Sequence, residues 1–170
     1  MTEQKKSASL KEDILFLVLK LLIFLVLIAA LVFFVFGICR CSDNMMSPAF
    51  KDGDLAIYYR LQKEFHPSDT VIIEKDGETQ IRRIIAKSGD SVEITADGLK
   101  INGYLQQETG IYTETLPYIE GISFPITLEE NEYFVLGDNR SGAKDSRIYG
   151  AIKKEEIKGT VITLLRHRGF

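Results

Sequence analysis

The chain has 170 residues, of which 45% are hydrophobic and 26% charged, and its formal net charge is −3 at pH 7. This nearly balanced charge argues against a nucleic-acid-binding protein, which usually presents a basic face. The two cysteines, Cys39 and Cys41, are too few for a disulfide framework or for a zinc site built from four thiolates. We expect neither a metal nor a cofactor.

Residues 14–38 form an apolar run that only Lys20 interrupts. The run is long enough to cross a bilayer, which takes about 20 apolar residues in a helix. A buried core helix is one alternative, but the rest of the chain is too short to surround a helix that is apolar on every side. A cleavable signal peptide is the other, and the run is longer than a typical signal-peptide hydrophobic region. We expect a cytoplasmic tail over residues 1–13, an uncleaved transmembrane anchor over 14–38 and an outer domain over 42–170.

The distribution of basic residues predicts the orientation of this anchor. Four basic residues precede or enter the span, namely Lys5, Lys6, Lys11 and Lys20. On the other side, Arg40 is the only basic residue before Lys51. Because an excess of Lys and Arg marks the cytoplasmic side, the N-terminus is expected inside the cell membrane and residues 42–170 outside. Cys39 and Cys41 would lie at the outer interface, where apolar packing is favoured over acylation.

From residue 53 onward, short alternating runs between turn signals predict a mainly β domain. The dipeptides Asp76-Gly77 and Asp97-Gly98 indicate hairpins. Two runs, Tyr133–Leu136 and Thr160–Leu165, are apolar enough to be buried strands, whereas residues 103–125 read as a long irregular insert. Lys153–Lys158 resembles a helical turn. The other predicted strands are near Leu55–Tyr59, Val71–Glu74, Gln80–Ile85, Ser91–Thr95 and Leu99–Ile101.

The most specific motif runs from Gly137 to Arg147 and reads GDNRSGAKDSR, with Gly150 after it. A polar turn after a buried strand would account for its composition, but not for so many specified residues at fixed spacing. The run resembles the GDNRxxSxDSRxxG signature of type I signal peptidases, the S26 family. Its structural residues in this chain are Asp138, Asn139, Arg140, Asp145, Ser146 and Arg147.

Three further segments resemble boxes of the same family. Residues 46–49 (MSPA) resemble the second half of its SMxPT box, and residues 53–55 (GDL) resemble its GDxV strand opening. Residues 82–90 (RRIIAKSGD) resemble its KRVxGxPGD box. The resemblance covers nearly the whole chain. It implies an antiparallel β-fold on one membrane anchor and an enzyme that removes signal peptides at the outer membrane face, with a nucleophilic serine and a lysine general base.

The resemblance also places other residues at the positions of that catalytic pair. Pro48 fixes the register of the first box, so the family serine falls on Met45, whose thioether has no proton to lose. Gly89 and Asp90 fix the other box, so the family lysine falls on Arg82, and a guanidinium stays protonated in proteins. The serine that helps to hold the lysine falls on Ala143. This mapping predicts that the dyad is absent.

A displaced nucleophile is the alternative, and Ser47 is the candidate because it lies two residues from Met45. The following Pro48 constrains it, and Lys87 should face away from Arg82 because the two differ in parity along one strand. The remaining bases are weaker candidates: Lys51, Lys144, His66 and His167.

Three functions remain open at this point. The first is a non-catalytic accessory protein or chaperone, because the chain resembles the signal-peptidase-like proteins of Gram-positive pilus gene clusters. That resemblance implies pilin or sortase as partner, besides the lipid bilayer, and an extended peptide held without cleavage beside Met45 and Arg82. The second is an active signal peptidase that uses Ser47, and the third is a structural membrane protein.

Overall fold

The computed structural model describes the backbone of residues 2–166 and the side chains of residues 12–166. Within this range the chain divides into two compact units, one that ends at Phe36 and one that begins at Gly37.

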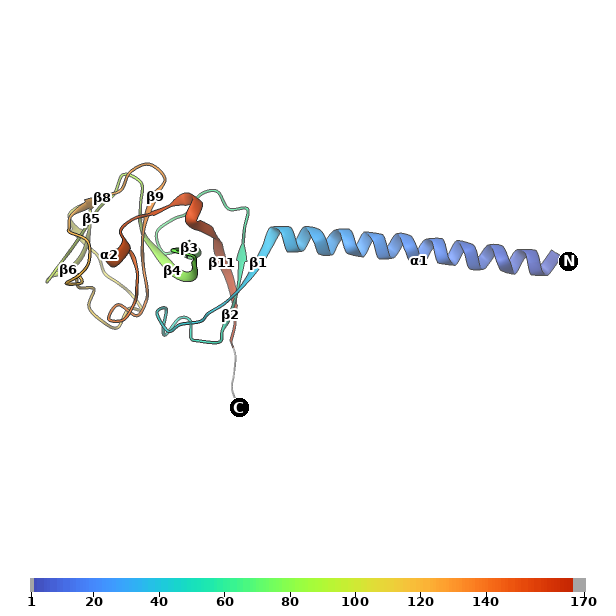
Figure 1. Ribbon diagram of the computed structural model, residues 1–170, viewed down its shortest axis with the longest axis horizontal. Coiled ribbons are helices and arrows are strands. Elements are labelled where there is room, and N and C mark those ends of the chain that lie inside the picture. Colours follow the sequence, from blue (N-terminus) through green and yellow to red (C-terminus); the bar gives the residue numbers. More distant parts are fainter. Residues whose placement is uncertain (1, 167–170) are drawn as a thin grey trace. The chain divides into compact units, whose positions relative to one another are not determined.

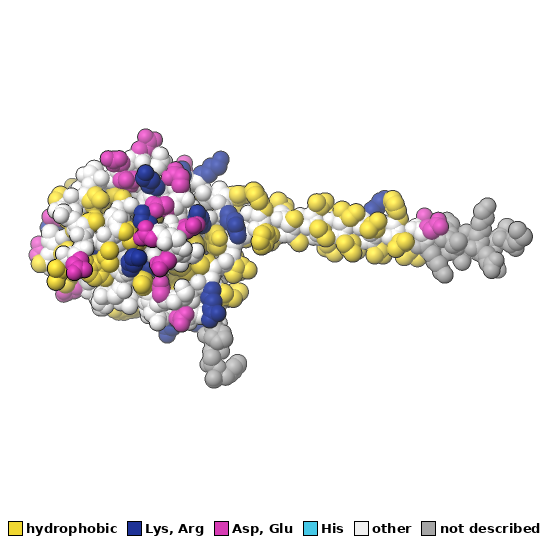
Figure 2. Space-filling model, in the orientation of Figure 1, with side chains coloured by type: hydrophobic (Ala, Val, Ile, Leu, Met, Phe, Trp, Pro, Cys, Tyr) yellow, Lys and Arg dark blue, Asp and Glu magenta, His cyan; other side chains and the backbone are white. Residues whose placement is uncertain are grey.

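The first unit consists of one long helix, α1 (Thr2–Val35). Its segment Glu12–Val35 has 24 residues, a mean hydropathy of 3.2 and no burial within the protein, so its length and composition allow it to cross a membrane. Hydrophobic side chains make up most of the visible face of this segment (Figure 2). The helix ends at Val35, and the last residues of the expected span instead begin a strand, β1 (Phe36–Arg40).

The second unit is built from antiparallel sheets, as the sequence predicts (Figure 1). In its described part, one sheet has seven strands in the order β1-β2-β11-β3-β4-β9-β10 and the other has four in the order β7-β6-β5-β8. The strands of the first sheet after β1 are β2 (Leu55–Tyr59), β3 (Thr70–Lys75), β4 (Glu78–Lys87), β9 (Glu132–Leu136), β10 (Ile152–Lys153) and β11 (Ile157–Leu165). The second sheet contains β5 (Ser91–Thr95), β6 (Gly98–Ile101), β7 (Tyr104–Leu105) and β8 (Ile126–Thr127).

Both predicted hairpins are present, but only the first has its turn at the predicted dipeptide. Asp76 and Gly77 connect β3 to β4 with φ of 54° and 79°, the positive values that a two-residue hairpin turn of type I′ requires. In the second hairpin, Thr95 pairs with Gly98, so the two-residue turn between β5 and β6 is formed by Ala96 and Asp97. The turn at Asp76 and Gly77 therefore fixes the register of β3 against β4, whereas the second turn lies one residue before the predicted Asp97-Gly98.

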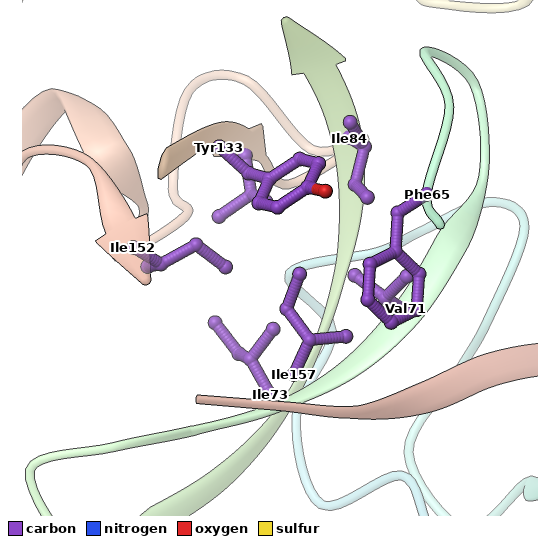
Figure 3. Close-up of a cluster of buried hydrophobic side chains, with 8 residues drawn as sticks. Phe65, Val71, Ile73, Ile84, Tyr133, Ile152 and Ile157 are labelled. Carbon is purple, nitrogen blue, oxygen red and sulfur yellow. The ribbon is translucent and has the colours of Figure 1, made fainter. Parts of the chain in front are cut away.

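Strand β9 is buried on both faces, which explains its continuous apolar sequence. Tyr133 and Val135 belong to a buried cluster with residues of β3, β4, β10 and β11, and Figure 3 shows Tyr133 among them. Phe134 and Leu136 point to the opposite side, into a cluster that contains Val92, Ile94 and Leu99 of the second sheet. The alternating side chains of one strand thus join the two sheets.

The predicted burial of Thr160–Leu165 is wrong, because Ile162 is 56% exposed and Leu165 is 55% exposed. This end of β11 pairs with β2, and the register shifts between Val161 and Thr163, so Ile162 has no partner there. The outer face of this part of the sheet is open, as is common in antiparallel sheets.

The two cysteines pack against one face of the first sheet. Cys41 is buried with Met46 and Tyr58, and Cys39 packs against the same cluster. Burial raises the pKa of both thiols. At Gly37, a Cβ atom would overlap the Tyr58 ring, so the close approach of β1 to β2 requires glycine there.

Two short helices complete the unit. The 3₁₀-helix η1 (Lys154–Glu156) falls within the segment predicted as a helical turn. The one-turn helix α2 (Ser146–Tyr149) was not predicted, although Asp145, which caps it by accepting the Arg147 backbone N–H, is a typical capping residue.

Candidate functional site

Met45 and Arg82, which are 37 residues apart in the chain, are in direct contact. The Arg82 Nη2 atom lies 2.8 Å from the Met45 sulfur. A general base must come within about 2.6–3.2 Å of the atom that it deprotonates. The two positions to which the motif register assigns a serine and a lysine therefore face each other at a proton-transfer distance.

Three segments position this pair. Arg82 is a buried residue of β4, two residues before the buried Ile84. Met45 lies in the loop between β1 and β2, and its carbonyl accepts the Asn139 backbone N–H at 2.9 Å. At Gly137, a Cβ atom would overlap both the Met45 carbonyl and the Ala143 side chain, so only glycine allows the three segments to approach this closely.

The loop that carries Met45 is closed by backbone hydrogen bonds at its base. The Cys41 N–H donates to the Asp54 carbonyl at 2.8 Å, and the Gly53 N–H donates to the Cys41 carbonyl at 2.9 Å. The Asp54 carboxylate, which is 2% exposed, accepts the Lys51 N–H at 3.0 Å. Residues 53–55 (GDL) thus lie where the loop closes and β2 begins.

The Arg82 guanidinium is completely buried and all three of its nitrogens have partners. Its Nε and Nη2 atoms donate to the Lys144 carbonyl at 3.0 and 2.8 Å, and Nη1 donates to the Ile81 carbonyl at 2.6 Å. The Asp43 carboxylate lies 3.8 Å from Nη1 and supplies the counter-charge. Arg82 thus has neither the exposure nor a free nitrogen with which to hold a peptide, so the expectation of a peptide bound by Arg82 does not fit this geometry.

Asp43 has a second contact that the sequence reasoning missed. One of its carboxylate oxygens accepts the Met45 backbone N–H at 2.8 Å. An amide beside the nucleophile is the kind of donor that stabilises an oxyanion, and here it already binds a carboxylate. The available signal was an Asp two residues before the expected nucleophile, because an Asp side chain often accepts a backbone N–H two residues on.

The buried Tyr149 phenol is no substitute for the base. Burial raises its pKa, although the nearby Arg82 guanidinium acts in the opposite direction. A phenol with a raised pKa remains protonated at neutral pH and cannot accept a proton from a hydroxyl group.

The GDNR motif forms ion pairs whose partners lie partly outside it. Asp138 accepts two hydrogen bonds from Arg83, at 2.8 Å from Nε and 2.6 Å from Nη2. This interaction raises the pKa of Arg83. Arg140 pairs with Glu108 at 2.6 Å and also binds the Thr115 hydroxyl at 2.9 Å. Glu108 belongs to the irregular insert, so no periodic signal in the sequence could identify it as a partner.

Asp145 and Arg147 pair with each other and are almost completely buried, at 0% and 1% exposed. Two side-chain hydrogen bonds of 2.9 and 2.8 Å join them. Asp145 also accepts the backbone N–H groups of Gly137 and Arg147, both at 3.1 Å. One carboxylate therefore ties together the start of α2, the end of β9 and a buried guanidinium.

The remaining motif residues bind backbone or provide space. The Ser146 hydroxyl accepts the Val135 N–H at 3.0 Å, and the Asn139 side-chain amide donates to the Asn44 carbonyl at 3.4 Å. Ala143 is 1% exposed and its carbonyl accepts the Tyr118 hydroxyl at 3.0 Å. Having no hydroxyl, its side chain cannot hold a base.

The displaced candidates are not brought together. Ser47 is half-buried and its backbone N–H donates to the Asn44 carbonyl at 3.1 Å. Among the described residues, no hydrogen bond joins its hydroxyl to a lysine or a histidine. Of the other candidate bases, Lys51 and Lys87 are exposed, the His66 side chain is 61% exposed beside Asp69, and His167 falls outside the described residues. Lys144 is half-buried and contacts the pair through its backbone: its carbonyl accepts hydrogen bonds from Arg82, and its N–H lies 3.4 Å from the Met45 sulfur. Likewise, no group of His, Cys, Asp and Glu in the described part of the chain is arranged to hold a metal ion.

Comparison with known proteins gives one consistent family. The model of the family "Signal peptidase, peptidase S26" matches residues 14–165. The chain is 32% identical to signal peptidase I of Bacillus licheniformis, over 94% of this chain and 92% of that protein. It is 31% identical to signal peptidase I T of Bacillus subtilis, again over 94% and 92% of the two chains. A solved signal peptidase I from Enterococcus faecalis is 28% identical and covers 59% of this chain and 98% of its own, with a TM-score of 0.47. On the family match and the two Bacillus relatives, the chain belongs to the signal peptidase I family, peptidase S26.

Proposed function

We propose that this chain is a non-catalytic member of its family, anchored in the cell membrane with the β unit outside. The contact between the Met45 thioether and the Arg82 guanidinium carries the proposal, because it lies where the motif register expects a serine and a lysine. A thioether has no proton to give up and forms no acyl intermediate, and a guanidinium does not act as a base at neutral pH.

The surroundings of the pair support the same reading. A catalytic lysine must be neutral, which requires a desolvated site without a fixed partner charge. Here the site holds a permanent cation, its counter-ion Asp43 and a carbonyl that accepts two of its hydrogen bonds. The carboxylate of Asp43 would also repel the negative charge that develops on a scissile carbonyl.

We propose an accessory or chaperone role in pilus assembly, with pilin or sortase as the partner. The support is the resemblance of the altered dyad and the single anchor to signal-peptidase-like proteins of pilus clusters. In a piliated strain that lacks this chain, polymerised pilin should be lost and should return with the wild-type chain. Normal polymers in the deletion strain would exclude this role.

The alternative is an active signal peptidase with Ser47 as nucleophile. Assays of peptide cleavage and of serine acylation distinguish it from a non-catalytic protein. The purified full chain in detergent is incubated with a signal-peptide substrate and with a serine-acylating inhibitor, beside the Bacillus licheniformis signal peptidase I as positive control. We expect no cleavage and no adduct from this chain. Stoichiometric acylation of Ser47, detected by mass spectrometry and abolished by Ser47→Ala, would overturn the non-catalytic proposal.

A further inference from the structure

A groove with a volume of about 610 Å3 opens on the β unit, and neither Met45 nor Arg82 lines it. Three segments form its walls: the turn at Pro48 and Ala49, the turn at Pro67 and Ser68, and residues 106–112 after β7. It is therefore a surface separate from the buried pair, within reach of solvent and large enough to hold several side chains.

The charged groups of this groove neutralise one another. Its lining contains Arg83 and Asp138, whose closest atoms are 2.6 Å apart, and Arg140 and Glu108, also 2.6 Å apart. Asp138 and Arg140 are largely buried, so a charged ligand could bind them only by separating a desolvated ion pair, at a high cost. The groove therefore favours an occupant without charge.

The rest of the lining combines apolar side chains with neutral polar groups. The register between β4 and β9 shifts between Ile84 and Ala86, and this bulge leaves Ile85 without a strand partner, in the groove lining. Ile101 and Ile111 add further apolar surface. At the wall, Tyr112 is 82% exposed, and exposed tyrosines beside apolar pockets are typical of contacts with other proteins.

We propose that this groove binds an extended, uncharged segment of another polypeptide chain. The polar lining groups include the side chains of Ser68, Gln106, Gln107 and Thr109. A polypeptide backbone offers alternating donors and acceptors to such groups while its uncharged side chains fill the apolar part. A hydrocarbon chain would offer no hydrogen bonds to these polar groups, and a phosphate or carboxylate ligand meets no free charge. The binding does not depend on whether the chain cleaves peptides.

The test measures peptide binding to the full chain in phosphatidylcholine nanodiscs by fluorescence anisotropy. The probe is the amidated heptapeptide Gly-Val-Ser-Ile-Thr-Val-Gly with a neutral dye at its N-terminus. We expect saturable binding that is weakened at least tenfold by Tyr112→Asp. The matched control is Ile119→Asp, which changes a fully exposed apolar residue of the same irregular segment that does not line the groove, and it should bind like the wild type. Peptides with Glu or Lys in place of Ser and Thr should bind at least tenfold more weakly.

A second measurement locates the bound peptide. A benzophenone at its central position should crosslink to residues 106–112 or to the turns at Pro48 and Pro67. The proposal is overturned if the wild-type chain shows no saturable binding of the neutral peptide, or if crosslinks map outside the groove. It is also overturned if the Tyr112→Asp variant binds this peptide as tightly as the wild-type chain does, or if the wild-type chain binds the charged peptides equally tightly. It is also overturned if Tyr112→Asp removes a bound phospholipid in native mass spectrometry or dissociates a dimer of this chain, because the occupant would then be lipid or a second copy.

Discussion

At the scale of single residues, two side chains of the same charge differ in the proton chemistry that they allow. Arg and Lys carry the same charge, but only Lys can lose its proton under the conditions of a folded protein. The buried site around Arg82 also requires several N–H donors in one plane, because the guanidinium donates to two carbonyls and to the Met45 sulfur at once. A lysine ammonium in the same place could not reproduce this geometry. The sequence predicts the two substitutions, whereas the counter-charge of Asp43 became evident only in the structure.

This arrangement predicts that restoring the dyad alone is insufficient. The variant Met45→Ser, Arg82→Lys, Ala143→Ser keeps Asp43, whose carboxylate accepts the amide N–H of residue 45. Adding Asp43→Ala frees that N–H and removes the negative charge, and one oxyanion donor is worth about 100-fold or more in rate. We expect the quadruple variant to cleave a signal-peptide substrate about 100-fold faster than the triple variant. Equal rates would contradict the blocking role of Asp43.

The buried pair of Asp145 and Arg147 predicts a large effect on stability. Asp145→Ala leaves a guanidinium that is 1% exposed without its carboxylate and also removes the α2 cap. Loss of one partner of a buried ion pair costs about 3–5 kcal/mol in the free energy of unfolding. Denaturant titration of the full chain in detergent measures this value. The control Asp97→Ala removes a pair at 3.8 Å whose carboxylate is 79% exposed, and should cost less than about 1 kcal/mol. Equal midpoints for the two variants would argue against the bracing role.

At the scale of elements, strands with alternating sequence and turns with glycine were predictable, and elements that depend on distant contacts were not. The β3–β4 hairpin follows from Asp76-Gly77, whose preferred backbone angles are local. The first three residues of β1 still belong to the apolar run of the span, and only the pairing with β2 makes this segment a strand. The exposure of Ile162 depends on a bulge, and the role of Glu108 depends on Arg140, 32 residues away. Such contacts leave no periodic signal in the sequence.

The inclusion of β1 in the sheet changes the boundary of the domain that should fold by itself. A fragment of residues 42–170, the domain expected from sequence, lacks β1 and leaves β2 at the edge of the sheet with the Tyr58 ring uncovered on the side of Gly37. A fragment of residues 37–170 keeps Gly37 over the Tyr58 ring and all of β1 except Phe36. We expect the shorter fragment to be less stable by about 2–3 kcal/mol, because it loses several hydrogen bonds and the packing of Cys39. Urea unfolding of both fragments measures the difference, and coincident curves would show that β1 contributes nothing.

The contact between β3 and η1 predicts a small dependence of stability on pH. Burial disfavours the ionised form of Glu156, but hydrogen bonds from the Lys75 ammonium at 2.8 Å and the Lys153 backbone N–H outweigh burial and lower its pKa below 4.5. With a lower pKa in the folded state, the stabilisation is present above pH 4.5 and is lost as the pH falls through the folded-state value.

Glu156→Gln should therefore destabilise the protein by less than about 1 kcal/mol at pH 7, because the side chains are only partly buried. The difference from the wild type should shrink as the pH is lowered below 4.5. Thermal unfolding between pH 3 and pH 7 provides the comparison. A difference that is constant over this range, or that grows toward low pH, would contradict the assignment.

At the scale of the whole molecule, hydrophobicity and charge are separated along the chain. The apolar surface is concentrated in the segment Glu12–Val35, while the ion pairs that order the motif all lie in the unit that begins at Gly37. Orientation in the membrane then decides which compartment the groove and its Tyr112 face. Three lysines precede the segment Glu12–Val35, and Lys20 lies within it. After the segment, Arg40 is the only basic residue before Lys51.

This asymmetry predicts an inside N-terminus, which cysteine labelling can measure. In intact cells, a membrane-impermeant maleimide should label an Ile119→Cys variant, because residue 119 is fully exposed, and should label Ser7→Cys only after permeabilisation. The wild-type chain controls for labelling of Cys39 and Cys41. Replacing the three lysines before the span with glutamine leaves Lys20 opposed to Arg40, so the bias nearly vanishes and a measurable fraction of Ser7→Cys should become labelled in intact cells. If the N-terminal cysteine is labelled in intact cells without these replacements, the β unit lies inside, and a role at the outer surface is excluded.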